Sequence, residues 1–283
     1  RQRQMCIRDR IYTPLFVIVF AFLSAVAANE IMKCAKVKNK FIVIFGTIVA
    51  AFIPFTSSES IMRPWFSEEV WGNFISILPP GALITVVVIA FFVAMIFDYK
   101  ETKFEDVAVS VVASVLVPYG FAMFGALRDY YDYRSPVGVY LIFYGLICAL
   151  GTDTGAQLGG MALGKHKLCP NISPKKTVEG AVCGVITGVF LNVIALLLYN
   201  RFASSTLDRS FVITLMVCAP FVGVFSMLGD LTASVLKRNF DVKDFGKIFP
   251  GHGGVMDRFD SSLFTVPLTF VIVSVFDAFF RMR

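Results

Sequence analysis

The chain has 283 residues, of which 57% are hydrophobic and 16% are charged, and its mean hydropathy is +0.73. Soluble domains carry about 25% charged residues, so this composition excludes an ordinary water-soluble protein and predicts an integral membrane protein. The net charge of +6 fits a surface that faces anionic lipid. Because the sequence has no basic arm interleaved with aromatic residues, we expect no nucleic-acid partner.

The first ten residues, RQRQMCIRDR, are polar, basic and aperiodic. They lack the apolar segment of a signal peptide, so we expect residues 1–10 to be a non-native leader and leave them out of the fold prediction. The remainder divides into N-terminal transmembrane helices, residues 11–135, and a C-terminal transmembrane region, residues 136–283, that carries the polar motifs.

Apolar segments follow one another along the rest of the chain. A helix needs about 20 apolar residues to cross the hydrocarbon core. Segments this uniformly apolar predict helices, because a barrel would show alternating strands of about ten residues. The predicted helices cover residues 11–28, 41–56, 75–97, 104–127, 136–160, 180–199, 211–233 and 262–280. The expected fold is therefore an all-α polytopic membrane protein with about eight transmembrane helices.

Lysine and arginine are distributed unevenly between the two sides of these helices. The loops after the first, third, fifth and seventh helices hold 15 of these residues, whereas the opposite side holds 7. The positive-inside rule places the first set in the cytoplasm. We therefore expect a multi-pass protein of the cell membrane, with two polar loops, residues 164–180 and 234–261, on the cytoplasmic side.

Aspartates stand at the cytoplasmic ends of the predicted helices, where ionisable groups are costly and often functional. Asp153 lies near the end of the fifth helix and Asp230 near the end of the seventh, and Asp257 and Asp260 open the eighth. Converging carboxylates repel one another unless a cation lies between them, and oxygen ligands favour a hard ion such as Mg²⁺. Two or more of these acids could hold one or two metal ions. The alternatives are a structural hydrogen bond for Asp153 and an acid that meets the helix dipole for Asp260.

Cations and glycines surround these acids in both polar loops. Mg²⁺ bound by carboxylates keeps open positions for substrate phosphates, and lysine and arginine pair with phosphate oxygens. Glycines beside His252 would let backbone N–H groups approach a phosphate. Such a site suits a nucleotide and a phosphate-bearing lipid, although the same charges could merely anchor helices at the interface. Gly151, Gly155 and Gly159 are spaced by four, which favours close helix packing.

The two loops resemble the conserved regions of a known family. Residues SVLKR (234–238), KD (243–244), FPGHGG (249–254) and DRFD (257–260) are similar to the signature of the phosphatidate cytidylyltransferases, also called CDP-diacylglycerol synthases. The upstream residues GTDTGA (151–156), GK (164–165) and ISPKKTVEG (172–180) resemble a second region of that family, in the same order. Together these motifs cover about residues 150–262.

The resemblance implies an enzyme that converts CTP and phosphatidate to CDP-diacylglycerol and pyrophosphate. It also implies dependence on Mg²⁺. A second cation, K⁺ or Mg²⁺, and a homodimer are left open. Asp230 and Asp257 match the metal-binding acids of the family. The implied catalytic residues are Asp230, Lys237, Arg238, Lys243, Asp244, His252, Asp257, Arg258 and Asp260. The implied substrate-binding residues are Asp153, Lys165, Ser173, Lys175, Lys176, Thr177, Ser234, Gly253 and Gly254.

Two other functions fit part of the pattern. A CTP-dependent lipid-alcohol kinase would use the same nucleotide but would release CDP. A secondary transporter could also use intramembrane aspartates, but such proteins tend to have repeated halves and a site near the midplane of the membrane. The sequence has no convincing internal repeat, and its acids lie towards one face.

Overall fold

The structure, a computed structural model, describes residues 2–57, 80–131, 135–203, 207–249, 251 and 253–280. These residues are mostly helical and form two compact units. Unit 1 comprises residues 1–129 and 244–257, and unit 2 comprises residues 130–243 and 258–283. The polar segment 244–257 therefore belongs with the N-terminal helices.

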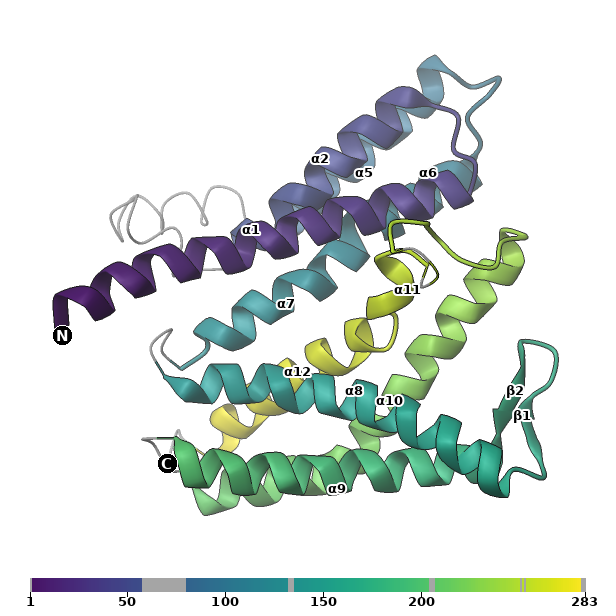
Figure 1. Ribbon diagram of the computed structural model, residues 1–283. Helices are drawn as coiled ribbons and strands as arrows, with labels where there is room; N and C mark the ends of the chain where they lie inside the picture. The colour runs from purple at the N-terminus through teal and green to yellow at the C-terminus, as the bar shows by residue number, and fades with distance from the viewer. Residues whose placement is uncertain are drawn as a thin grey trace. The chain divides into compact units, whose positions relative to one another are not determined.

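Unit 1 consists of helices that run along one another (Figure 1). Its elements are α1 (Gln2–Cys34), α2 (Lys40–Thr56), α5 (Pro80–Phe97), α6 (Phe104–Val111), the π-helical turn η1 (Val112–Leu116) and α7 (Val117–Asp129). Ile42 and Ile53 of α2 and Phe91 of α5 are fully buried in a core cluster of this unit. The predicted helix 104–127 is thus observed as α6, η1 and α7 in succession.

Unit 2 contains the remaining helices and a small hairpin. Its elements are α8 (Pro136–Leu163), β1 (Lys167–Cys169), β2 (Ser173–Thr177), α9 (Val178–Phe202), α10 (Arg209–Asn239) and α12 (Ser262–Phe280). The short helix α11 (Met256–Phe259) contains the boundary between the two units. The antiparallel strands β1 and β2 connect α8 to α9, as Figure 1 shows.

The helices α8 and α9 approach each other at their glycines. A Cβ atom added to Gly151 would lie 3.3 Å from the Cα of Gly188, and one added to Gly155 would lie 3.1 Å from the Cα of Gly184. Gly159, one turn further on, would meet Cys183. Small residues let helix backbones come close in membranes, so these contacts support the packing interpretation of the spaced glycines.

The observed helices confirm an all-α polytopic membrane protein. Among the residues that the structure describes, six helices are long and apolar enough to cross a membrane: Leu15–Cys34, Phe104–Asp129, Pro136–Leu163, Val178–Phe202, Arg209–Asn239 and Ser262–Phe280. Lys40–Thr56 and Gly81–Phe97 are shorter apolar helices. The structure differs from the prediction at the polar loops, where α10 continues to Asn239, a hairpin occupies part of the loop 164–180, and α11 precedes α12 as a separate turn.

Candidate active site

Three predicted acids of unit 2 lie within electrostatic reach of one another. Asp153 is on α8, Asp230 is on α10, and Asp260 is in the turn before α12. Burial raises the pKa of Asp260 to about 7, and the negative charges of Asp230 and Asp153 add to this effect. The Ser261 hydroxyl donates a 2.8 Å hydrogen bond to Oδ2 of Asp153, which joins α8 to this turn. Asp153, Asp230 and Asp260, called the acidic cluster below, therefore bring three carboxyl groups together in a partly buried environment.

Two lysines balance part of this charge. Nζ of Lys176, on β2, lies 2.5 Å from Oδ2 of Asp230, and the two side chains are 24% and 29% exposed. Lys237, two turns after Asp230 on α10, lowers the pKa of Asp260. Lys175 is exposed, whereas Lys176 is half-buried, as expected because neighbouring side chains in a strand point to opposite faces. The hairpin thus presents one of its two adjacent lysines to the acids.

Polar contacts between helices hold this cluster in place. Thr265 of α12 donates a 2.9 Å hydrogen bond to the carbonyl of Gly145 on α8, and Ser226 of α10 donates to the carbonyl of Ala149. Thr177 is buried and caps α9, because its hydroxyl accepts the N–H of Gly180 at 3.1 Å. Thr177 therefore has a structural role in addition to the substrate contact predicted for it.

Asp257 lies at the start of α11 and belongs to unit 1. Its Oδ2 accepts the backbone N–H of Phe245 at 2.8 Å and that of Gly254 at 2.9 Å. Gly253 has a φ of +82°, and a Cβ atom there would lie 2.8 Å from the same Oδ2. The glycines therefore let the loop fold closely around a carboxylate, and the N–H of Gly254 is directed to Asp257.

Sequence reasoning missed Glu30, an acid of α1 in unit 1. Its side chain is buried, with 7% of the residue exposed, and it accepts the backbone N–H groups of Val255 and Met256. The signal that could have found it is a lone glutamate at the end of an apolar helix, in the sequence NEIMKC. The predicted helix ends at residue 28, whereas α1 continues to Cys34 and includes Glu30.

The other predicted residues lie on the polar elements around these acids. Ser173 and Ser234 are half-buried. The side chains of the remaining charged residues are exposed: Lys165, Arg238, Lys243, Asp244 and Arg258. His252 lies outside the described residues. Asp230 and Asp257 belong to different units, so their pairing stays a prediction.

The acids have the chemistry that Mg²⁺ requires. Carboxylate oxygens are its preferred protein ligands, and it is usually bound by one or two of them together with substrate phosphates. In the described part of the chain, no three acidic, histidine or cysteine side chains form a ready metal cage. These carboxylates therefore fit a Mg²⁺ ion that is held by one or two of them and whose remaining coordination positions are filled by a phosphate ligand.

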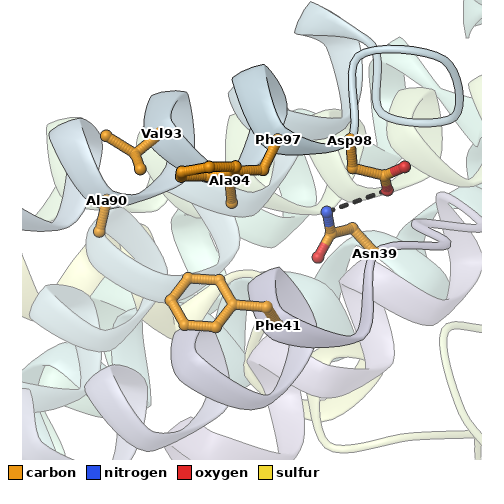
Figure 2. Close-up of a pocket in the computed structure, with 7 residues that line it drawn as sticks. All are labelled: Asn39, Phe41, Ala90, Val93, Ala94, Phe97 and Asp98. Atoms are coloured by element: carbon orange, nitrogen blue, oxygen red, sulfur yellow. Dashed lines mark hydrogen bonds between the residues drawn. The ribbon is translucent and has the colours of Figure 1, made fainter.

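A separate groove lies between α2 and α5 in unit 1 (Figure 2). It has a volume of about 420 Å³ and one polar end, where Nδ2 of Asn39 donates a 3.2 Å hydrogen bond to Asp98. Its described lining consists of Asn39, Phe41, Ala90, Val93, Ala94, Phe97 and Asp98. These residues include none of the predicted site residues, so the groove is not the candidate active site.

Comparisons with known proteins agree with the motifs. Residues 10–276 match the sequence model described as the Cytidylyltransferase family. A phosphatidate cytidylyltransferase of Bacillus subtilis (strain 168) is 39% identical over 173 residues, which are 61% of this chain and 60% of the relative. One from Staphylococcus aureus (strain COL) is 32% identical over 260 residues, or 92% of this chain and 90% of the relative. One from Staphylococcus epidermidis (strain ATCC 12228 / FDA PCI 1200) is 33% identical over 262 residues, with the same coverage.

Proposed function

The chain belongs to the cytidylyltransferase family, and on this premise we propose that it transfers a cytidylyl group from CTP to phosphatidate. The products are CDP-diacylglycerol and pyrophosphate. The names of its relatives support this reaction. The observation that carries the proposal is the cluster of Asp153, Asp230 and Asp260 with Lys176, because both conserved regions contribute to it.

The reaction needs charge neutralisation more than it needs a base. A phosphate oxygen of phosphatidate attacks the α-phosphorus of CTP and forms a new P–O bond, while the bond to the bridging oxygen breaks and pyrophosphate leaves. The attacking oxygen is already anionic, so no strong general base is required. The main barrier is repulsion between two negatively charged substrates, which positioned cations reduce.

The predicted site residues would divide this task between them. Asp230 and Asp257 would hold Mg²⁺, which when bound neutralises phosphate oxygens and aligns them for in-line displacement. Lys176 and Lys237, which lie beside acids in the structure, would offset the charge of a bound phosphate. Arg238, Lys243 and Arg258, which are exposed, would do the same for the departing pyrophosphate.

The site would lie at the cytoplasmic surface of the membrane. The excess of lysine and arginine in the two polar loops supports this orientation. CTP would arrive from water, while the acyl chains of phosphatidate would remain in the bilayer. The membrane boundary is the place that both substrates can reach. The homodimer and a second cation, K⁺ or Mg²⁺, remain predictions.

Product analysis tests the proposed reaction. The purified protein, reconstituted with phosphatidate and Mg²⁺, is given CTP labelled on the α-phosphate, and the lipid and aqueous products are separated. We expect the label in CDP-diacylglycerol and one pyrophosphate released per lipid formed, with the Asp230→Asn variant as the inactive control. Release of CDP with a phosphorylated lipid alcohol would instead indicate a kinase. Solute uptake without CTP turnover would indicate a transporter.

A further inference from the structure

Glu30 carries a buried carboxylate near the C-terminal end of α1. Its Oε1 accepts the N–H of Val255 at 3.1 Å, and its Oε2 accepts the N–H of Met256 at 3.0 Å. A buried carboxylate is costly unless it is paired or hydrogen-bonded. An apolar residue could pack there at lower cost, so the two backbone hydrogen bonds are what the acid supplies.

The segment 245–256 is shaped to receive this side chain. Gly246 and Gly254 both lie against the carboxylate, and a Cβ atom on Gly254 would lie 2.5 Å from Cδ of Glu30. Cys34, one helical turn after Glu30, donates a 3.1 Å hydrogen bond from Sγ to the carbonyl of Phe245. One face of α1 therefore contacts both ends of this segment.

The same segment encloses Asp257. Glu30 accepts the N–H groups of Val255 and Met256, and Asp257 accepts those of Phe245 and Gly254. Two carboxylates, one on α1 and one on α11, thus accept four backbone N–H groups of one short loop. Met256 directly precedes Asp257. The hydrogen bond that the N–H of Met256 donates to Glu30 therefore fixes the start of the turn that carries Asp257.

We propose that Glu30 is a positioning residue, which holds the segment 245–256 on α1 and thereby fixes the direction of the Asp257 carboxylate. This inference rests on the proposed function for its catalytic consequence. It gives the N-terminal helix α1 a role in positioning Asp257, although that helix carries none of the family motifs that the sequence shows.

The first experiment compares Glu30→Gln with Glu101→Gln in the reconstituted enzyme. Gln offers one acceptor oxygen, so one of the two N–H groups loses its partner and faces an amide NH₂. We expect kcat/KM to fall at least tenfold and the half-saturating Mg²⁺ concentration to rise, while the temperature of unfolding changes little. Glu101, which pairs with Lys38 at an exposed position, should tolerate the same change without loss of activity.

A second variant guards against a Glu30 substitution that fails to fold. In Gly246→Ala, the added methyl group occupies space that the Glu30 carboxylate fills, so it displaces the same contact from the other side. We expect the same rise in the Mg²⁺ requirement. Full activity and an unchanged Mg²⁺ requirement in either folded variant would overturn the positioning role.

Labelling of Cys34 gives a readout that does not depend on turnover. Its thiol is half-buried and bonded to Phe245, so release of the segment should expose it. We expect Glu30→Gln to raise the rate of Cys34 modification by a maleimide severalfold, measured by peptide mass spectrometry, with Cys169 as the internal reference. An unchanged rate of Cys34 modification would refute the idea that Glu30 holds the segment 245–256 on α1. A raised rate in Glu30→Gln, together with an unaltered protein that makes no CDP-diacylglycerol, would support the contact between Glu30 and the segment 245–256 but refute the proposed function.

Discussion

Neighbouring residues of the hairpin differ sharply in what they touch. Lys176 pairs with Asp230 at 2.5 Å, whereas Lys175, one position earlier on β2, is exposed. Sequence alone gave both lysines the same expected role. Because adjacent strand residues face opposite ways, the structure separates them.

A matched pair of variants tests this difference. Lys176→Ala should lower kcat/KM by about tenfold or more, equivalent to about 1.4 kcal/mol, because a cation beside the acidic cluster is lost. Lys175→Ala should raise the KM for at least one of the two substrates, CTP or phosphatidate, with little effect on kcat. Steady-state kinetics with CTP and phosphatidate varied in turn measure both, and equal effects of the two variants would contradict the assignment.

The carboxylate of Asp257 has observed hydrogen bonds to its loop and a proposed role in metal binding, and one substitution separates the two. Asp257→Asn keeps an oxygen that can accept the N–H groups of Phe245 and Gly254, so the loop should still fold. The loss of negative charge should remove metal affinity and lower kcat on the order of 100-fold or more, since a metal supplies several kcal/mol of transition-state stabilisation.

The control for this variant is Asp241→Asn in the same polar tract. Asp241 is exposed and has a φ of 53°, a conformation that Asn also tolerates. We expect it to retain activity, and circular dichroism should show both variants folded. Normal turnover by Asp257→Asn would remove Asp257 from the proposed metal site.

At the level of elements, the packing of α8 against α9 depends on the absence of side chains. A Cβ atom on Gly155 would lie 2.5 Å from Cβ of Thr187, and overpacking of this kind costs about 1–3 kcal/mol. Gly155→Ala should therefore lower the unfolding temperature of the detergent-solubilised protein by roughly 3 °C or more. Gly81→Ala is the control, because a Cβ atom there meets nothing within 4 Å, and an equal shift in both variants would argue against the glycine contact.

The long helices could be predicted from the sequence, but the short elements between them could not. Hydrophobicity over about 20 residues determines a membrane helix, so the helix 262–280 was predicted with the bounds observed for α12. The strands β1 and β2 hold exposed lysines and a proline and show no alternation of apolar residues. Their pairing is set by the two helices that bring their ends together, which no local pattern reveals.

For the whole molecule, the sequence predicted the family, and the family is confirmed. Asp153, Asp230 and Asp260 influence one another electrostatically, while their role as site residues stays a prediction. The lone glutamate at the end of an apolar helix marks Glu30 in the sequence, but its contacts could not be predicted, because its partners are backbone groups more than 200 residues away. A contact of this kind leaves no mark in composition or spacing.

The proposed metal dependence is also tested on the whole protein together with its substrates. Because Mg²⁺ is usually held by one or two carboxylates together with substrate phosphates, the protein alone should bind Mg²⁺ much more weakly than the protein with nucleotide does. EDTA should abolish CDP-diacylglycerol formation and added Mg²⁺ should restore it fully. Calorimetric titration of Mg²⁺ with and without a CTP analogue checks this, and equally tight binding in both would contradict a site that needs substrate phosphates.

The backbone contact between α8 and α9 has a consequence for the hairpin that joins them. Asp153 lies on one of these helices and Lys176 just before the other, so the glycine contact restricts their relative motion before any ligand arrives. The conformational entropy that an incoming anion would otherwise have to remove is already lost during folding, which leaves more of its interaction energy for affinity. A bulkier residue in this contact should therefore lower the affinity for substrate even where the protein still folds.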